Sequence, residues 1–196
     1  MDEQKELEFY YDSLSLEHYP FKILALITVL ADEQRAYRGT LQQLCEQLEI
    51  QSSSGNTNKI KAALEVLVQK QYVHVLVDKT TYTITLTHAA ARDKKIIKIK
   101  MAWYTLLREH SGSGTWGNAL KVFLALLEVP RDTPITYQKI AEQLAISVST
   151  VSRCVSLICS INFTDFKIRK EVVNIKQPDN TFICLGNTFE QVLSFE

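Results

Sequence analysis

The chain has 196 residues, of which 46% are hydrophobic and 22% are charged, proportions typical of a globular protein. No apolar run reaches the roughly 20 residues that a membrane-spanning helix needs. The start MDEQKELEF is acidic and lacks the basic and then apolar pattern of a signal peptide. We therefore expect a cytoplasmic protein with no membrane partner.

The charge is balanced overall and uneven along the chain. The 22 Lys and Arg match the 22 Asp and Glu, which argues against a uniformly basic surface. Residues 1–19 hold six acidic residues and one lysine, a net charge of −5, so the remaining residues carry +5. This modest excess indicates one localised basic face.

Residues 1–19 form an acidic N-terminal segment in which Leu7, Tyr10, Tyr11 and Leu14 keep helical spacing. The spacing predicts a short amphipathic helix. It packs either on its own domain or on a second copy of the protein, and the sequence leaves both open. A homodimer through this helix would use the aromatic side chains that include Phe9.

Residues 20–88 predict three helices followed by a β-hairpin. Phe21–Ala31 is almost wholly apolar, and a polar run DEQRAYRG ends this first helix. Thr40 and Gln43 form a capping box for the second helix, LQQLCEQLEI. The third helix follows the corner QSSSGNT and buries its apolar stripe. The inner faces of these two helices comprise Leu41, Leu44, Cys45, Leu48, Ile60, Ala63, Leu64 and Leu67.

The hairpin spans Tyr72–Thr87, where apolar residues alternate with period two around Asp78, Lys79 and Thr80. Three helices and a hairpin in this order resemble the winged-helix superfamily, although the corner QSSSGNT is longer than its usual turn. The resemblance implies a DNA-recognition helix and a wing that contacts DNA. Its candidate DNA-binding residues are Asn58, Lys59, Lys61 and Lys79.

Residues 89–110 predict one basic connecting helix with a buried stripe that includes Ile97, Met101 and Tyr104. Its cations are either the solvated face of a packed helix or contacts to DNA phosphates between two binding units. The candidate phosphate contacts are Arg92, Lys94, Lys95 and Lys98.

The Gly/Ser-rich stretch Ser111–Asn118 is the best candidate for a domain boundary, and it opens a second domain over residues 111–196. It contains G-x-G-x-x-G, but a dinucleotide fingerprint must follow a strand, and here it follows a predicted helix. Ala119–Val129 mirrors the first apolar helix, and TYQKIAEQLAI repeats the pattern of TLQQLCEQLEI. After residue 162, alternating strands surround a turn at Pro178, Asp179 and Asn180.

Thr136–Ile158 carries the most specific signal, because two amphipathic helices flank a corner of three residues. Ser147 is a good N-cap for the second helix. The run LAISVSTVSR resembles the turn and recognition helix of bacterial helix-turn-helix regulators, with Ala145 where glycine is common. A plain helical hairpin is the structural alternative.

The second helix has Val151, Val155 and Ile158 inward, so its polar residues are candidates for DNA contact. Arg153 is the best candidate for reading guanine, and its alternative is a salt bridge within the chain. The hydroxyls at the helix start suit phosphate oxygens. Together with the second wing, the candidates are Ser147, Ser149, Thr150, Ser152, Arg153, Lys167, Arg169 and Lys170.

Catalytic and cofactor motifs are absent from the sequence. The four histidines lie far apart without metal-ligand spacing, and there is no G-x-S-x-G or Walker lysine motif. The four cysteines form no C-x-x-C pair and read as reduced apolar residues. We therefore expect no enzyme activity, no cofactor and no metal.

The predicted fold class is mainly α with small antiparallel β-hairpin wings (α+β), as two winged-helix domains joined by a helix. The expected partner is double-stranded DNA. We expect the chain to bind it sequence-specifically and to act as a transcriptional regulator. A plasmid or phage replication initiator is the first alternative, because tandem winged helices around a basic helix resemble such proteins. A winged-helix scaffold for protein partners is the second.

Overall fold

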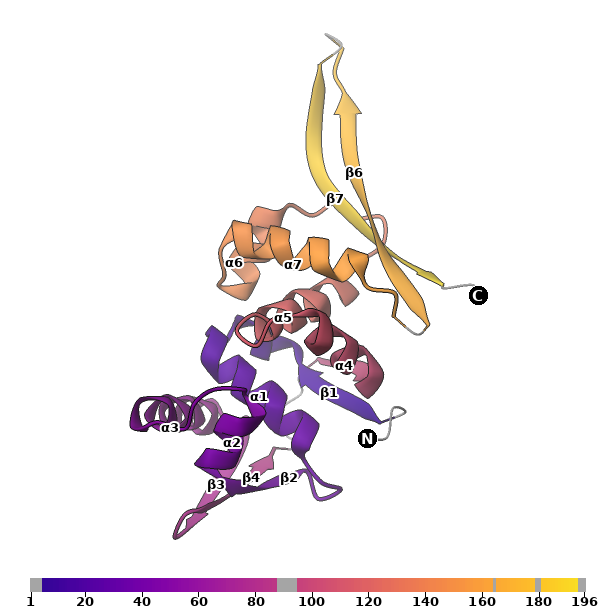
Figure 1. Ribbon diagram of the computed structural model, residues 1–196. Helices are drawn as coiled ribbons and strands as arrows, with labels where there is room; N and C mark the ends of the chain where they lie inside the picture. Colours follow the sequence, from indigo (N-terminus) through magenta and orange to yellow (C-terminus); the bar gives the residue numbers. More distant parts are fainter. Residues whose placement is uncertain (1–4, 88–94, 164, 179–180, 194–196) are drawn as a thin grey trace. The chain divides into compact units, whose positions relative to one another are not determined.

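The computed structural model describes residues 5–87, 95–163, 165–178 and 181–193 (Figure 1). The chain is α+β, and its helices pack with small sheets whose assigned pairings are antiparallel. The internal contacts divide it into two units, and the chain passes from one to the other between Ile99 and Lys100. We call them the N-terminal unit and the C-terminal unit and describe each by itself.

The N-terminal unit begins with a strand and a short 3-10 helix and then alternates helices with strands. Its elements are β1 (Glu6–Tyr10), η1 (Tyr11–Ser15), α1 (His18–Leu30), β2 (Ala36–Thr40), α2 (Leu41–Gln47), α3 (Ser54–Gln69), β3 (Val73–Asp78), β4 (Thr81–Leu86) and β5 (Ile96–Lys100). The helix α1 is buried over ten consecutive residues and forms the centre of this unit.

The start of each of the next two helices follows from local capping. Thr40 and Gln43 form the predicted capping box, with each side chain bonded to the other residue's backbone amide. Ser53 accepts a hydrogen bond from the Asn56 amide at 3.3 Å, so α3 begins at Ser54. The corner before α3 is therefore shorter than the sequence suggested, because part of QSSSGNT is helical.

The strand β2 was not predicted, because AYRGT lacks a run of β-branched residues. Local hydrogen bonds order the turn that leads into this strand. The Asp32 carboxylate accepts from the amides of Gln34 and Ala36, and Arg35 has a φ of 59° that turns the chain. The strand then pairs with β4, giving a three-stranded sheet in the order β2-β4-β3.

The prediction of an amphipathic helix at the N-terminus was wrong. Residues Glu6–Tyr10 form β1, which pairs with β5, and η1 follows. Leu7 and Phe9 are 1% and 2% exposed, so the period-two alternation with Glu6 and Glu8 decides the structure. Because Phe9 and Tyr10 are buried within the chain, they form no surface for the homodimer that the sequence left open.

The prediction of one basic helix over residues 89–110 was also wrong. Ile96–Lys100 is the strand β5, and the helix α4 (Met101–His110) begins only afterwards. Ile97 and Ile99 are buried and alternate with lysines, the period of a strand with one buried face. Arg92 and Lys94 lie outside the described residues.

The C-terminal unit packs four helices beside a long hairpin. After α4 come α5 (Trp116–Leu127), α6 (Tyr137–Leu144), α7 (Val148–Ser160), β6 (Phe166–Lys176) and β7 (Phe182–Leu193). The Gly/Ser-rich stretch connects α4 to α5 inside this unit. Stacked rings of Phe123, Phe163 and Phe166 fill the core where α5 meets the base of β6.

The hairpin β6–β7 extends well beyond the helices of its own unit (Figure 1). A bridge between Ile135 and Asn187 attaches its middle to the segment before α6. Gly186 has a φ of 133°, and a Cβ there would lie 2.7 Å from the Ile135 carbonyl oxygen. Glycine is therefore required where the bridge and a β-bulge meet.

Candidate functional site

The helix pair α6–α7 turns sharply at a corner of three residues. The two helices are bent by 106° across it. Ala145 adopts the left-handed conformation with φ 52°, and the Ile146 amide donates to the Ala141 carbonyl at 3.1 Å. The sequence predicted this corner and placed Ala145 at its turn. An alanine in this conformation costs roughly 1 kcal/mol relative to glycine.

Three hydroxyl groups gather at the start of α7. Ser147 is the N-cap, as predicted, and its Oγ accepts from the Thr150 amide at 3.2 Å. The same Oγ lies 3.0 Å from Ser149 Oγ and 2.8 Å from Thr150 Oγ1. The helix therefore begins with a compact set of hydroxyls beside the positive end of its dipole, which favours anions.

The two faces of α7 differ sharply in chemistry. Val151, Cys154, Val155 and Ile158 are buried. The outward face is short and polar, with Ser152 half-buried and Ser149, Arg153 and Ser156 exposed. Such a face lets another molecule approach the helix closely.

Arg153 is the only cation of α7. Its side chain makes no ion pair or hydrogen bond with the described residues, so the salt bridge weighed as its alternative is not seen there. Arg153 lines a shallow pocket of about 250 Å³ between α7 and the start of α5, with Thr115, Asn118 and Thr150. Burial raises the pKa of the neighbouring Cys154 thiol to about 11, against the opposing effect of Arg153.

A buried lysine of α5 forms a hydrogen bond with the corner between α6 and α7. Lys121 of α5 is 0% exposed, and its Nζ donates a hydrogen bond of 3.0 Å to the carbonyl of Leu144, the last residue of α6. Burial lowers the pKa of Lys121 to about 8. Sequence reasoning missed this residue, although a single lysine inside the run ALKVFLALLEV was a usable signal. Lys22 occupies the matching position of α1 and is 4% exposed.

The base of the hairpin brings cations close to α7. Lys167, Arg169 and Lys170 are exposed on β6, and Lys170 Nζ lies 3.4 Å from Tyr137 Oη at the start of α6. Burial raises the pKa of Cys159 near the end of α7, while the positive charges of Lys170 and Lys167 oppose the rise. Lys170 therefore lies close to both helices of the pair, and Lys167 lies close to the end of α7.

In the N-terminal unit, the helix α3 has a different neighbourhood. Asn58, Lys59 and Lys61 are exposed along it, and Lys79 forms the turn of the β3–β4 hairpin with φ 54°. Between α3 and this hairpin lies an open groove of about 530 Å³. Its lining is mainly apolar and comprises Lys61, Leu64, Glu65, Val68, Gln69, Val75, Val77 and Tyr82.

Two of the cations expected to contact phosphate have contacts within the chain. Lys98 Nζ lies 3.2 Å from Glu8 and 3.6 Å from Glu6. Lys95 Nζ lies 5.2 Å from the centre of the Tyr11 ring. Burial alone would raise the pKa of Glu8, but Arg35 and Lys98 hold it below its ordinary value.

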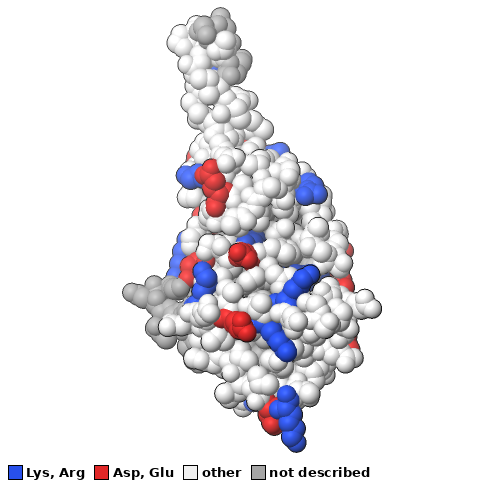
Figure 2. Space-filling view, turned by 90° about the vertical axis from the view of Figure 1, so that its left-hand side faces the viewer, with Lys and Arg blue, Asp and Glu red and all other residues white. Residues whose placement is uncertain are grey.

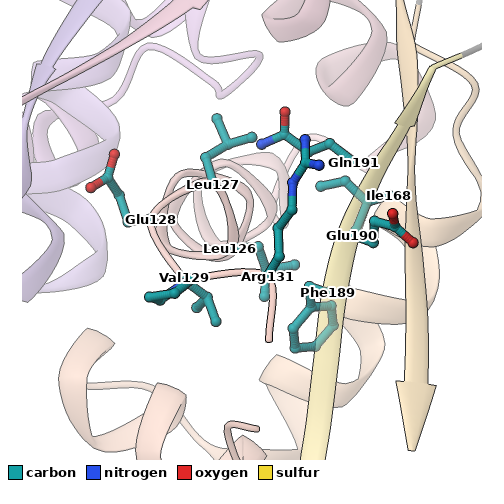
Figure 3. Close-up of a pocket in the computed structure, with 10 residues that line it drawn as sticks. Leu126, Leu127, Glu128, Val129, Arg131, Ile168, Phe189, Glu190 and Gln191 are labelled. Carbon is teal, nitrogen blue, oxygen red and sulfur yellow. The ribbon is translucent and has the colours of Figure 1, made fainter. Parts of the chain in front are cut away.

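A second pocket lies at the end of α5 and has a volume of about 250 Å³. Figure 3 shows Glu128 turned away from Arg131, and Arg131 extends on the side of Glu190 and Gln191. The charged groups therefore do not converge on one point. Among the described residues, no group of three or more His, Cys, Asp and Glu side chains could hold a metal ion.

The visible surface carries interspersed charges of both signs, and the projecting hairpin is mostly uncharged on that face (Figure 2). Within the described ranges, no single helix is long and apolar enough to cross a membrane, and α6 and α7 meet that test only as a bent pair. No family model and no curated protein matches the chain.

Proposed function

We propose that the C-terminal unit binds double-stranded DNA sequence-specifically and that the chain regulates transcription. The observation that carries the proposal is the outward face of α7, which is short, polar and equipped with a cation that is unpaired among the described residues. The bend of 106° between α6 and α7 falls in the range typical of helix-turn-helix motifs. In that arrangement, α7 enters the major groove.

The roles of the side chains follow from their positions. Ser147, Ser149 and Thr150 meet phosphate oxygens at the start of α7, where the helix dipole favours anions. Arg153, one turn further along, reaches the edge of a guanine with two parallel N–H groups. The cations Lys167 and Arg169 at the base of β6 contact the flanking backbone and supply the salt-dependent part of the affinity.

The order of elements supports a winged-helix interpretation for both units. In the C-terminal unit, the Ile135–Asn187 bridge takes the place of the first strand, and β6–β7 forms a long wing. In the N-terminal unit, β2, β3 and β4 form the corresponding sheet. The apolar groove beside α3 favours a protein contact for the N-terminal unit, the scaffold function weighed as an alternative.

The test is selection from random-sequence duplexes by the full chain at several salt concentrations, followed by sequencing of the retained DNA. We expect a recovered motif, and Arg153→Ala should weaken binding to it by about 5- to 150-fold, which corresponds to about 1–3 kcal/mol. Arg153→Lys keeps the positive charge but loses the two parallel N–H groups that contact guanine. It should therefore reduce the sequence specificity more than the affinity.

The matched control is Arg131→Ala, which removes an exposed arginine of the same unit away from the α7 face. It should leave the motif unchanged. The position of recovered sites separates a promoter regulator from a replication initiator, whose sites would repeat near an origin. Failure to retain any duplex at low salt would refute DNA binding and favour the scaffold function.

A further inference from the structure

The outer edge of the N-terminal sheet is the strand β3. The order β2-β4-β3 leaves this side without a partner strand among the described residues. Exposed edges are usually protected by a proline, a bulge or an inward charge. The sequence VHVLVD has no proline or lysine, and its register with β4 is continuous. This edge is therefore open to another strand.

Both faces of the edge expose apolar side chains. Leu76 is 73% exposed on one face, and Val77 is 56% exposed on the other. Val75 lies beside Val77 in the groove, and Val68 of α3 is 42% exposed across from them. An apolar, unprotected edge of this kind is typical of an interface between proteins.

The register with β4 fixes which backbone groups face outward. Asp78 and Thr81 close the hairpin around a loop of two residues, so they form a hydrogen-bonded pair. Because such pairs alternate along an antiparallel ladder, Leu76 and His74 also bond to β4. The amide and carbonyl groups of Val73, Val75 and Val77 are then directed toward the open edge.

We propose that β3 pairs antiparallel with β3 of a second copy of this chain, around a twofold axis at Leu76. Val75 then bonds to Val77 of the second copy, using the outward backbone groups. Leu76 meets Leu76, and His74 lies opposite Asp78 twice across the axis. The two sheets join into one of six strands.

Side-chain complementarity selects this register over its neighbours. An axis at Val75 would place His74 opposite Leu76, and an axis at Val77 would place Leu76 opposite Asp78. Only the axis at Leu76 places the imidazole of His74, a hydrogen-bond donor, opposite the carboxylate of Asp78 and pairs the apolar positions Val75, Leu76 and Val77 with apolar residues. Residues 74–78 of a second copy therefore complement this edge, which gives an isologous dimer.

The first test measures the mass of the full chain by sedimentation equilibrium without DNA. We expect a dimer, and Leu76→Lys should weaken it at least tenfold, because two lysines would face each other across the axis. The control Ile175→Lys places the same charge on the exposed part of the β6–β7 hairpin, and its dimer should persist. Thermal unfolding of each variant by circular dichroism checks that the fold is kept.

The second test fixes the register by oxidative cross-linking in a Cys184→Ser background, since Cys184 is the exposed native cysteine. Leu76→Cys should link to itself, because opposite residues of a non-hydrogen-bonded pair have Cα atoms about 4.5 Å apart. His74→Cys and Asp78→Cys should each fail alone and link when mixed.

A monomer at about 100 µM would overturn the proposal, since that concentration populates even weak dimers. A dimer that Leu76→Lys leaves intact, or cross-links at positions outside this register, would also overturn it. Neither test contains DNA, so their failure leaves the proposed DNA binding untouched.

Discussion

The buried Lys121 makes a specific prediction about stability and pH. Its pKa is about 8 in the folded chain and 10.5 in an ordinary setting, a difference worth about 3 kcal/mol in free energy of unfolding. Between these two values, the unfolded chain holds a proton that the folded chain has released. The free energy of unfolding therefore rises with pH from about 8 to about 10.5, and below pH 8 the unfavourable burial of the charge is fully present.

Cys154 has the opposite effect at higher pH. Burial raises its thiol pKa from 9 to about 11, so above pH 9 the unfolded chain releases a proton that the folded chain keeps. The stability contributed by Cys154 is present below pH 9 and is lost as the pH rises toward 11. Lys121 adds about 1 kcal/mol between pH 8 and pH 9, and a comparison with a variant that lacks this lysine cancels the opposing contributions of the cysteines.

The assay is urea unfolding of the wild type and of Lys121→Met at several values from pH 7 to pH 9. Methionine fills similar space without a charge, so the stability of the wild type relative to the variant should rise by about 1 kcal/mol across the last unit. Lys139→Met removes an exposed lysine of α6 and serves as the control. A constant difference between wild type and Lys121→Met would refute the reasoning.

Three further substitutions test the corner and the bridge by thermal or urea unfolding. Ala145→Gly relieves the left-handed alanine and should stabilise the chain by roughly 1 kcal/mol, and a loss of stability would contradict the observed φ of 52°. Ser147→Ala removes the N-cap and should destabilise by about 1 kcal/mol, whereas Ser147→Asp should restore the cap. Gly186→Ala should destabilise by more than 1 kcal/mol, since its Cβ would strike the Ile135 backbone, while Gly114→Ala, with nothing within 4 Å of its Cβ, should be nearly neutral.

The features predicted best from the sequence are those that depend on interactions between residues close together in the chain. The α6–α7 corner and the Thr40 capping box depend on residues within a few positions of each other, so their signals are readable directly. The strands β1 and β5 were missed because they stabilise each other across most of the N-terminal unit. A helical period also fits the apolar residues Leu7, Tyr10, Tyr11 and Leu14. Only the pairing with the distant strand β5 decides between a helical period and the period of two typical of a strand.

The buried lysine could not be assigned a role from sequence for a similar reason. A lysine within an apolar run indicates burial, but its acceptor is the Leu144 carbonyl, 23 positions away. The apolar groove is likewise a property of packing. Val75 and Val77 alternate as in any half-buried strand, and only the structure shows that α3 leaves Val77 more than half exposed.

The two units differ in the surface beside the helix that precedes the hairpin. The outward face of α7 carries short polar side chains, whereas α3 borders an apolar groove. DNA binding by both units would not explain why the groove beside α3 is apolar. The proposed DNA binding uses the polar face of α7, and the proposed self-association uses the apolar edge of β3 beside the groove.

The two proposals together predict how many half-sites the bound DNA contains. A dimer through β3 carries two copies of α7, so the recovered motif should contain two half-sites that are bound cooperatively. Leu76→Lys should bind each half-site with unchanged affinity and lose the cooperativity, whereas Arg153→Ala should weaken both half-sites and leave the protein dimeric. Electrophoretic mobility shifts on one and two half-sites measure the difference. A single half-site occupied by one copy, with no effect of Leu76→Lys on longer duplexes, would show that the two surfaces act independently.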